Sequence, residues 1–170
     1  MPEQLIITGF HRSGTSLTAQ FLLKSGLFIG DELMHATPDN PHGHFEDIEA
    51  LFFHERVLKR NALSWMVAGD AEVKLSQENV QWMRDFAGKR NREHALWGFK
   101  DPRTCFFLDA WKSVIPDARI LVVFRNPSDC VASLHRRHAR LLAEGAEPAD
   151  QHRKFFVEPD LALRMWIAYN

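Results

Sequence analysis

The sequence predicts an α/β protein, a three-layer sandwich in which a central parallel sheet carries helices on both faces. Two observations support this fold class. Short apolar runs at 5–8, 96–100 and 119–124 alternate along the chain with longer segments of helical character. A glycine-containing turn joins the first apolar run directly to the first helical segment, which is how a βαβ unit begins. Such alternation is typical of parallel sheets that are covered on both sides.

Size and composition restrict the class of protein further. The chain has 170 residues, so we expect residues 1–170 to form a single domain, and 45% hydrophobic residues suffice for a real core. The net charge of -1 argues against binding to nucleic acid or to a membrane surface. No apolar run approaches the ~18 residues of a membrane span, and we find no secretory signal. The two cysteines form no CxxC pair, so we expect a cytoplasmic protein with reduced thiols; its oligomeric state stays open.

The N-terminal third of the chain predicts one strand, two helices and a long loop. Residues 5–8 are too few for a helix and are followed by glycine, so they predict a buried strand. Residues 13–25 place apolar side chains at helical spacing and end before a glycine, as helices often do. The segment 31–44 is rich in Pro, Gly, His and Asp and predicts a loop long enough to be functional. Residues 47–61 again have the spacing of an amphipathic helix.

The remaining segments continue the alternation. The strongest strand signal lies at 119–124, because this run is apolar and β-branched and is followed by Asn126-Pro127. Either Ser128 or Asp129 can cap the helix that follows it. The other predicted elements are a strand at 96–100 and helices at 76–89, 104–114, 128–143 and 159–169.

The turn at 9–16 has the composition of a phosphate-binding loop. Free backbone N–H groups and the positive dipole end of the following helix favour an anion there. Its two glycines allow close approach, and Arg12 adds a charge whose planar geometry suits phosphate. The spacing is the GxxxxG of a nucleotide P-loop, but Thr15 stands where such loops have lysine. The alternative is a glycine turn that only caps the helix. The candidate phosphate ligands are Arg12, Ser13, Gly14, Thr15 and Ser16.

Two segments together resemble the sulfotransferase family. Arg12-Ser13-Gly14-Thr15-Ser16 is similar to the family's 5′-phosphosulfate loop, with arginine where many members have lysine, as in bacterial and carbohydrate-directed branches. The segment 122–133 looks like the family's 3′-phosphate segment, in which an arginine at a strand end precedes a serine by eight residues. Arg125 and Ser133 have that spacing. The resemblance implies 3′-phosphoadenosine 5′-phosphosulfate as co-substrate, bound by both segments.

Two shorter segments extend the resemblance and imply catalytic residues. Residues 40–47 look like the Gly-x-Phe-Glu-Asp segment of bacterial members, and residues 98–103 resemble the family's Lys-x-Pro segment. The resemblance implies an enzyme that transfers a sulfuryl group to a hydroxyl or amine of a small-molecule or carbohydrate acceptor, without a metal. In it Arg12 stabilises the leaving phosphosulfate, Lys100 contacts the sulfuryl or bridging oxygen, and Glu46 is the base.

The identity of the base stays open at this point. Cytosolic members have a histidine two residues after the strand-end lysine, and this chain has Pro102 there. Glu46 can serve as base or as a residue at the start of the next helix. The other candidates are Asp101, His42 and His44. These histidines and His54 lack a recognised zinc spacing, so we expect no metal site.

Three functions are compatible with the sequence. The first is an active sulfotransferase. The second is a P-loop phosphotransferase, against which the missing lysine after Gly14 counts. The third is an inactive nucleotide-binding remnant, because family members usually continue into a segment that closes over the donor, and nothing follows Asn170 in this sequence.

Two groups of residues have no assigned role in the sequence. Residues 136–140 are basic and lie either beside the 3′-phosphate, beside an acidic acceptor or on a solvated helix face. Five aromatic side chains belong either to the core or to an apolar acceptor pocket: Phe45, Phe52, Phe53, Trp65 and Trp97.

Overall fold

The computed structural model describes residues 2–37, 40 and 43–170. Its centre is a parallel sheet with the strand order β2-β1-β3. The strands are β1 (Glu3–Thr8), β2 (Leu96–Lys100) and β3 (Arg119–Val122), and Ile6 of β1 lies in register with Phe99 and Ile120 of its neighbours. The predicted α/β class with a central parallel sheet is confirmed.

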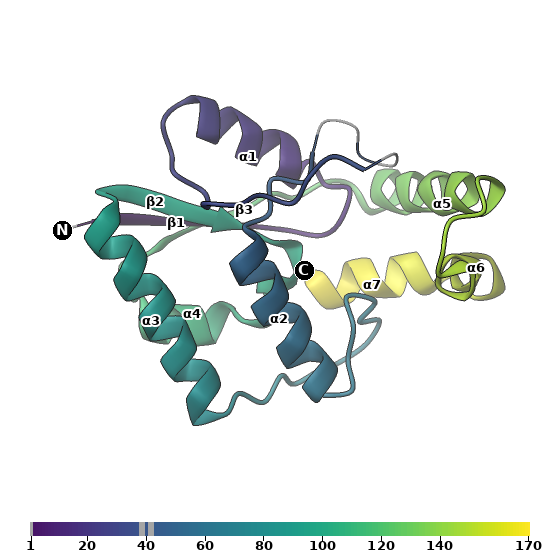
Figure 1. Cartoon of the computed structure of the whole chain (residues 1–170). Coiled ribbons are helices and arrows are strands. Elements are labelled where there is room, and N and C mark those ends of the chain that lie inside the picture. Colours follow the sequence, from purple (N-terminus) through teal and green to yellow (C-terminus); the bar gives the residue numbers. More distant parts are fainter. Residues whose placement is uncertain (1, 38–39, 41–42) are drawn as a thin grey trace.

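Helices cover both faces of this sheet (Figure 1). One face carries α1 (Thr15–Lys24), and the other carries α2 (Ile48–Arg60), α3 (Gln77–Glu93) and α4 (Leu108–Val114). Successive side chains of a strand point to opposite faces, and β1 supplies both layers in this way.

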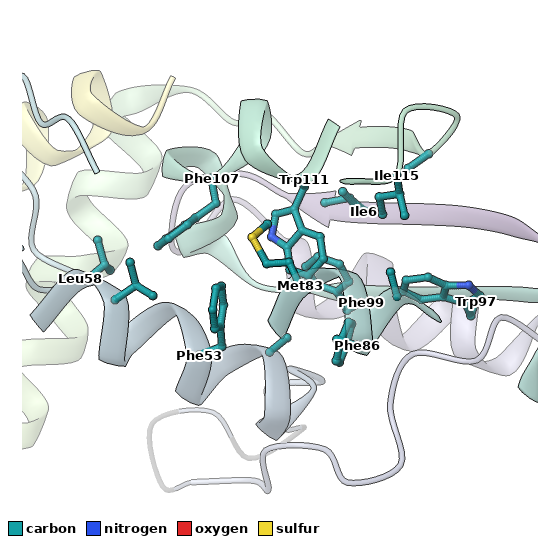
Figure 2. Close-up of a cluster of buried hydrophobic side chains, with 14 residues drawn as sticks. Ile6, Phe53, Leu58, Met83, Phe86, Trp97, Phe99, Phe107, Trp111 and Ile115 are labelled. Atoms are coloured by element: carbon teal, nitrogen blue, oxygen red, sulfur yellow. The ribbon is translucent and has the colours of Figure 1, made fainter. Parts of the chain in front are cut away.

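The larger core lies between the sheet and α2, α3 and α4. Ile6 and Phe99 from the strands meet Phe53, Phe86 and Trp111 from the helices, and all five are buried (Figure 2). On the opposite face, buried apolar residues of β1, α1 and the segment after α1 form a smaller core: Ile7, Ala19, Leu27 and Ile29. The two cores fix the sheet between its helical layers, so the ends of the strands are held in place.

Three C-terminal helices form a third group beyond the ends of the strands (Figure 1). They are α5 (Pro127–Ala143), α6 (Ala149–Val157) and α7 (Leu161–Tyr169), and they bury a core around Phe10. The sequence did not predict α6. The predicted helix at 104–114 is two elements, a 3₁₀ turn at Pro102–Phe106 and then α4, and the predicted strand at 119–124 ends at Val122. Among the described residues, no helix is both long and apolar enough to cross a membrane.

Candidate active site

The carboxyl ends of all three strands meet at one edge of the sheet, because the strands are parallel. In Figure 1 they point toward α5 and α7. Thr8 at the end of β1 donates a hydrogen bond from Oγ1 to the carbonyl oxygen of Asp101, which directly follows β2, at 3.1 Å. Ligands of open α/β sheets bind at this edge.

The loop between β1 and α1 has a backbone that requires glycine. Gly9 has φ 137°, and a Cβ at this position would clash with the backbone of Val123. Gly14 has φ 104° and is the N-cap of α1, so no side chain caps the first turn of this helix. The same turn contains the hydroxyl residues Thr15 and Ser16. An anion is the partner that such a helix end accommodates best.

The two segments that the sequence assigned to the donor lie against each other. Arg12 donates from Nε to Ser133 Oγ at 3.0 Å, and Arg125 donates from Nη1 to the carbonyl oxygen of Arg12 at 3.3 Å. Ser13 donates from Oγ to the carbonyl oxygen of Phe10 and so holds the loop in place. The structure thus brings together residues that are 121 positions apart in the chain.

A basic cavity opens beside this contact. Its volume is about 250 Å³, and its described lining consists of Arg12, Ser133, Arg136, Arg137 and Arg140. The run at 136–140 therefore belongs to the wall of a cavity and is not merely a solvated helix face. Four guanidinium groups around one cavity favour a phosphate-bearing ligand.

Lys100 lies between the first turn of α1 and the predicted base. Its Nζ donates to Glu46 Oε1 at 2.6 Å, to the carbonyl oxygen of His44 at 3.2 Å and to Ser16 Oγ at 3.4 Å. Both charged side chains are almost fully buried, with exposed fractions of 2% for Lys100 and 5% for Glu46. The two predicted catalytic residues of the 40–47 and 98–103 segments are thus in direct contact.

Glu46 does not cap α2. The capping residue is Asp47, whose Oδ1 accepts from the backbone N–H groups of Glu49 and Ala50. The side chain of Glu46 points instead to Lys100 and lies 3.6 Å from Arg103 Nη1. The sequence left open whether Glu46 serves as a helix cap or as a base. The structure excludes the cap role and places the Glu46 side chain in the candidate site.

Asp101 has a structural environment that does not suit a base. It accepts from His54 Nδ1 at 2.8 Å and from Arg103 Nη1 at 2.9 Å, and it is fully buried. Burial alone would raise the pKa of the Asp101 carboxyl, but Arg103 and His54 outweigh it and hold this pKa well below its usual range. Trp111 donates from Nε1 to His54 Nε2 at 3.0 Å, which assigns the proton of His54 to Nδ1. His54 therefore orients Asp101.

A second cavity, of about 310 Å³, has Glu46 in its lining. His11, His44, Arg103 and Arg137 also line it. His11 lies near Tyr169, with 3.2 Å between Nε2 and Oη. Its enclosed position lowers the pKa of His11, and the cations Arg103, Lys100 and Arg137 lower it further, so the imidazole is neutral near pH 7.

The remaining sequence candidates divide between core, surface and cavity. Phe53 and Trp97 are buried in the larger core, whereas Phe52 is 60% exposed. Phe45 packs against the core beside α1, and Trp65 lines the cavity beside Glu46. These five side chains therefore do not form one apolar acceptor pocket.

The sequence also offered His44 and His42 as candidates for the base. His44 lines this cavity, with 2.8 Å between its Nε2 and Thr37 Oγ1, and His42 lies outside the described residues. Within the part of the chain that the structure describes, no three His, Cys, Asp or Glu residues are grouped so that they could hold a metal ion.

Arg103 and His11 line the candidate site although the sequence assigned them no role, and the sequence noted Arg137 only as part of the basic run at 136–140. Arg103 belongs to the 98–103 segment, but sequence gives no signal that a charged side chain will be buried. His11 lies inside the loop at 9–16, where the sequence pattern assigned roles only to the glycine, arginine and hydroxyl residues. Arg137 is part of the basic run, and only the helix orientation shows that it faces two cavities.

Fold and site together define an α/β protein with a glycine-containing strand–loop–helix at the carboxyl edge of its sheet. A sequence model described as the sulfotransferase family matches residues 3–166. The chain therefore belongs to the sulfotransferase family, and the resemblance found in its motifs is confirmed. No curated protein and no solved structure matched the chain.

Proposed function

We propose that this protein transfers a sulfuryl group from 3′-phosphoadenosine 5′-phosphosulfate to a hydroxyl or amine of a small-molecule or carbohydrate acceptor. One observation supports this most: Lys100 contacts Ser16 on the anion-binding side and Glu46 on the other. A cation thus lies between an anion site and a carboxylate that lines a separate cavity. Sulfuryl transfer needs this order: the donor at the anion site, a cation at the group that is transferred, and the acceptor beside the carboxylate. We further propose that residues 1–170 act as one domain.

The residues of the proposed donor site fit a nucleotide with two phosphate-bearing positions. The uncapped first turn of α1, with Ser13, Gly14, Thr15 and Ser16, would hold the 5′-phosphosulfate. Arg125 and Ser133, together with the arginines of the 250 Å³ cavity, would hold the 3′-phosphate. Arg12 contacts Ser133 and belongs to the loop itself, so it joins the two halves.

The donor supplies an activated sulfuryl group, whose S–O bond to the 5′-phosphate breaks as the acceptor oxygen or nitrogen bonds to sulfur and 3′-phosphoadenosine 5′-phosphate departs with the electron pair. Glu46 takes the proton that the acceptor loses. Lys100 places its ammonium beside the sulfuryl or bridging oxygen, and Arg12 stabilises the charge that the leaving phosphate gains. Positioning and positive charge account for the rate enhancement in this mechanism.

A phosphotransferase is the alternative, and the loop itself argues against it. Residue 15, which follows the second glycine, is Thr15, and its side chain is buried. The cation of the loop is Arg12, which turns to Ser133 and the basic cavity. An ATP-dependent enzyme of this type would need a lysine and magnesium at the terminal phosphate.

Calorimetric titration separates these functions. We expect 3′-phosphoadenosine 5′-phosphate to bind more tightly than ATP with magnesium, and Arg125→Ala to lose most of that affinity. Arg119→Ala is the control, since this exposed arginine lies at the opposite end of β3. Tighter, magnesium-dependent binding of ATP would contradict the proposal. Radiolabelled sulfate transfer to a panel of acceptors then distinguishes an active enzyme from a protein that only binds the nucleotide.

A further inference from the structure

Arg103 is a buried cation that the mechanism proposed above does not use. Its side chain is only 9% exposed, and it belongs to the 3₁₀ turn that begins at Pro102, just after β2. The guanidinium group lies within ion-pair distance of three carboxylates, and one of them is the proposed base, Glu46. A charged side chain is rarely buried without a set of partners that requires it, so these partners indicate what Arg103 does.

A chain of buried side chains holds Arg103 from the side of the larger core. Trp111, which belongs to that core (Figure 2), donates from Nε1 to His54 Nε2 at 3.0 Å. His54 in turn donates from Nδ1 to Asp101 Oδ2 at 2.8 Å. The other oxygen of this carboxylate, Oδ1, accepts from the backbone N–H and from Nη1 of Arg103, each at 2.9 Å. Trp111, His54 and Asp101 are fully buried, so these hydrogen bonds fix Nη1 without competition from water.

The same nitrogen of Arg103 faces Glu46. Nη1 lies 3.6 Å from Glu46 Oε2, whereas Lys100 Nζ lies 2.6 Å from Glu46 Oε1, so each oxygen of the carboxylate has a cation of its own. A separation of 3.6 Å is too long for a hydrogen bond, and within the part of the chain that the structure describes Oε2 accepts none. The lone pairs of Oε2 therefore remain for a proton from the cavity that Glu46 lines.

Arg103 acts on Glu46 as a constant charge. Burial alone would lower the pKa of the Arg103 guanidinium, but the carboxylates of Asp101, Glu46 and Glu55 outweigh burial and raise this pKa. The third of these carboxylates, Glu55, is half exposed, so water screens its contact with Nη2 at 2.8 Å. The fully buried Asp101 is therefore the partner that fixes the guanidinium group in position.

We propose, on the basis of the function proposed above, that Arg103 is a positioning residue for the base Glu46. Lys100 holds Oε1 of the carboxylate, and Nη1 of Arg103 keeps Oε2 apart from Lys100 and turned to the acceptor. In the reaction the O–H or N–H bond of the acceptor breaks, its proton bonds to Oε2, and the electron pair of that bond forms the new bond to sulfur. Arg103 touches no reacting atom: it acts through Glu46, and Asp101 and His54 act through Arg103.

A kinetic double-mutant cycle of the wild type, Arg103→Met, Glu46→Gln and the double variant tests this role. The probes are glucose, glucosamine and 4-nitrophenol as acceptors of radiolabelled sulfate, and the cycle uses the acceptor that is sulfated fastest. Misplacing a catalytic group by about 1 Å can cost ~10²-fold in rate, so Arg103→Met should lower kcat by about that factor, with KM for the acceptor little changed. The double variant should lose no more than Glu46→Gln alone, because Arg103 acts only through Glu46. Losses that multiply would overturn the inference.

The pH profile of kcat separates the charge of Arg103 from its geometry. A carboxylate that loses a neighbouring cation is protonated at higher pH, and a protonated base is inactive. Arg103→Met should therefore move the acid limb of the profile to higher pH. Arg103→Lys keeps the charge but not the planar fork, so it should keep the acid limb of the wild type and still lower kcat at the plateau. The other titratable or charged groups that line the cavity with Glu46 are unchanged in these variants: His11, His44, Glu55, Arg137, His138 and His152.

Folding is monitored by circular dichroism, because Arg103→Met leaves the buried carboxylate of Asp101 without its cation. Arg103→Lys keeps a cation beside Asp101, so the same cycle is run with this variant, and a kcat equal to that of the wild type would refute the role of Arg103. Arg164→Met is the matched control: Arg164 pairs with Glu158 and Asp160 and does not belong to the described lining of either cavity of the site. It should keep the kcat and the pH profile of the wild type.

The outcomes separate this inference from the proposed function. If the wild-type protein neither binds 3′-phosphoadenosine 5′-phosphate nor transfers sulfate to any of the three acceptors, the proposed function is wrong. If the wild type transfers sulfate and Glu46→Gln slows the transfer, but both Arg103 variants turn over like the wild type, only the role of Arg103 is wrong.

Discussion

Lys100 and Glu46 compensate each other's charge in a nearly dry environment, 2.6 Å apart. Removing one partner of a buried ion pair typically costs ~3–5 kcal/mol, because the other charge is left uncompensated. We expect Glu46→Gln and Lys100→Met each to lower the free energy of unfolding by about that amount, and the double variant to lose clearly less than the sum. Urea denaturation of the four proteins gives the coupling energy as a double-mutant cycle. Additive losses would show that the pair does not contribute as an ion pair.

Turnover tests the chemical role of Glu46 apart from stability. If its carboxylate accepts the proton of the acceptor, Glu46→Gln should lower kcat by ~10²–10⁴-fold and leave the affinity for 3′-phosphoadenosine 5′-phosphate unchanged. Glu55→Gln is the control, because Glu55 lines the same cavity and pairs with Arg103 but is half exposed. Steady-state sulfate transfer, followed at a temperature at which all variants are folded, gives the kcat of both variants. Full turnover in Glu46→Gln would make the assignment of the base wrong.

Among the elements, the loop that carries Glu46 depends on α3. Arg90 of α3 is almost fully buried and pairs with Asp47 at 3.0 Å and with Asp31, so it holds both ends of the segment 31–47. The backbone N–H of Met34 also donates to the carbonyl oxygen of Glu46 at 2.8 Å. Fixing this loop on a helix of the larger core places Glu46 beside Lys100 before any ligand binds.

Removing the guanidinium group of Arg90 should loosen the loop that carries Glu46. We expect Arg90→Met to lower the free energy of unfolding by ~3–5 kcal/mol, since the buried carboxylate of Asp47 loses its partner. Hydrogen exchange at residues 31–37 and 43–47 should rise more than in the sheet. Lys89→Met is the control, because Lys89 pairs with Asp31 at the surface, where such pairs contribute ~0–1 kcal/mol. Uniform acceleration of exchange across the molecule would show that Arg90 acts on the whole core and not on this loop.

The sequence predicted best those elements whose signals are local. The strand–loop–helix at 5–24 was recognisable because glycine positions, hydroxyl residues and apolar spacing lie within one short stretch. The helix α6 was missed because it is short, begins after Pro148 without a side-chain cap and is buried through tertiary contacts, mainly with α5 and α7. The helix expected at 104–114 is interrupted at Phe107, whose side chain enters the larger core. Tertiary packing decided both cases.

For the molecule as a whole, the donor half of the site was more predictable than the acceptor half. Arg12, Arg125 and Ser133 occur in two contiguous segments with a defined spacing, and the structure brings these segments together. The cavity beside Glu46 instead combines single residues from separate elements, such as His11, Arg103 and Gln151. No spacing in the sequence links these residues, so their shared cavity follows only from the arrangement of α5 and α6 beyond the ends of the strands.

Global stability should depend on pH through His11. The pKa of His11 is lowered well below 6.5 in the folded protein, first by its enclosure and then by Arg103, Lys100 and Arg137. Below about pH 6.5 the unfolded chain therefore binds a proton that the folded protein rejects, and stability falls as the pH falls. At higher pH both states are neutral at this residue, and its contribution is constant. Urea denaturation of the wild type between pH 5 and 8 should show this loss of stability on the acid side.

His11→Gln isolates that contribution from the other histidines. The variant should lose part of the decline between pH 6.5 and 5, whereas His35→Gln, a matched change of a histidine outside the candidate site, should keep the wild-type slope. The introduced glutamine side chain would still fill part of the space between the loop and Tyr169, so the folded state should persist at pH 8. An unchanged slope in His11→Gln would mean that His11 binds its proton equally well in the folded and unfolded states, and that the cations at this end of the cavity are more strongly screened than their positions indicate.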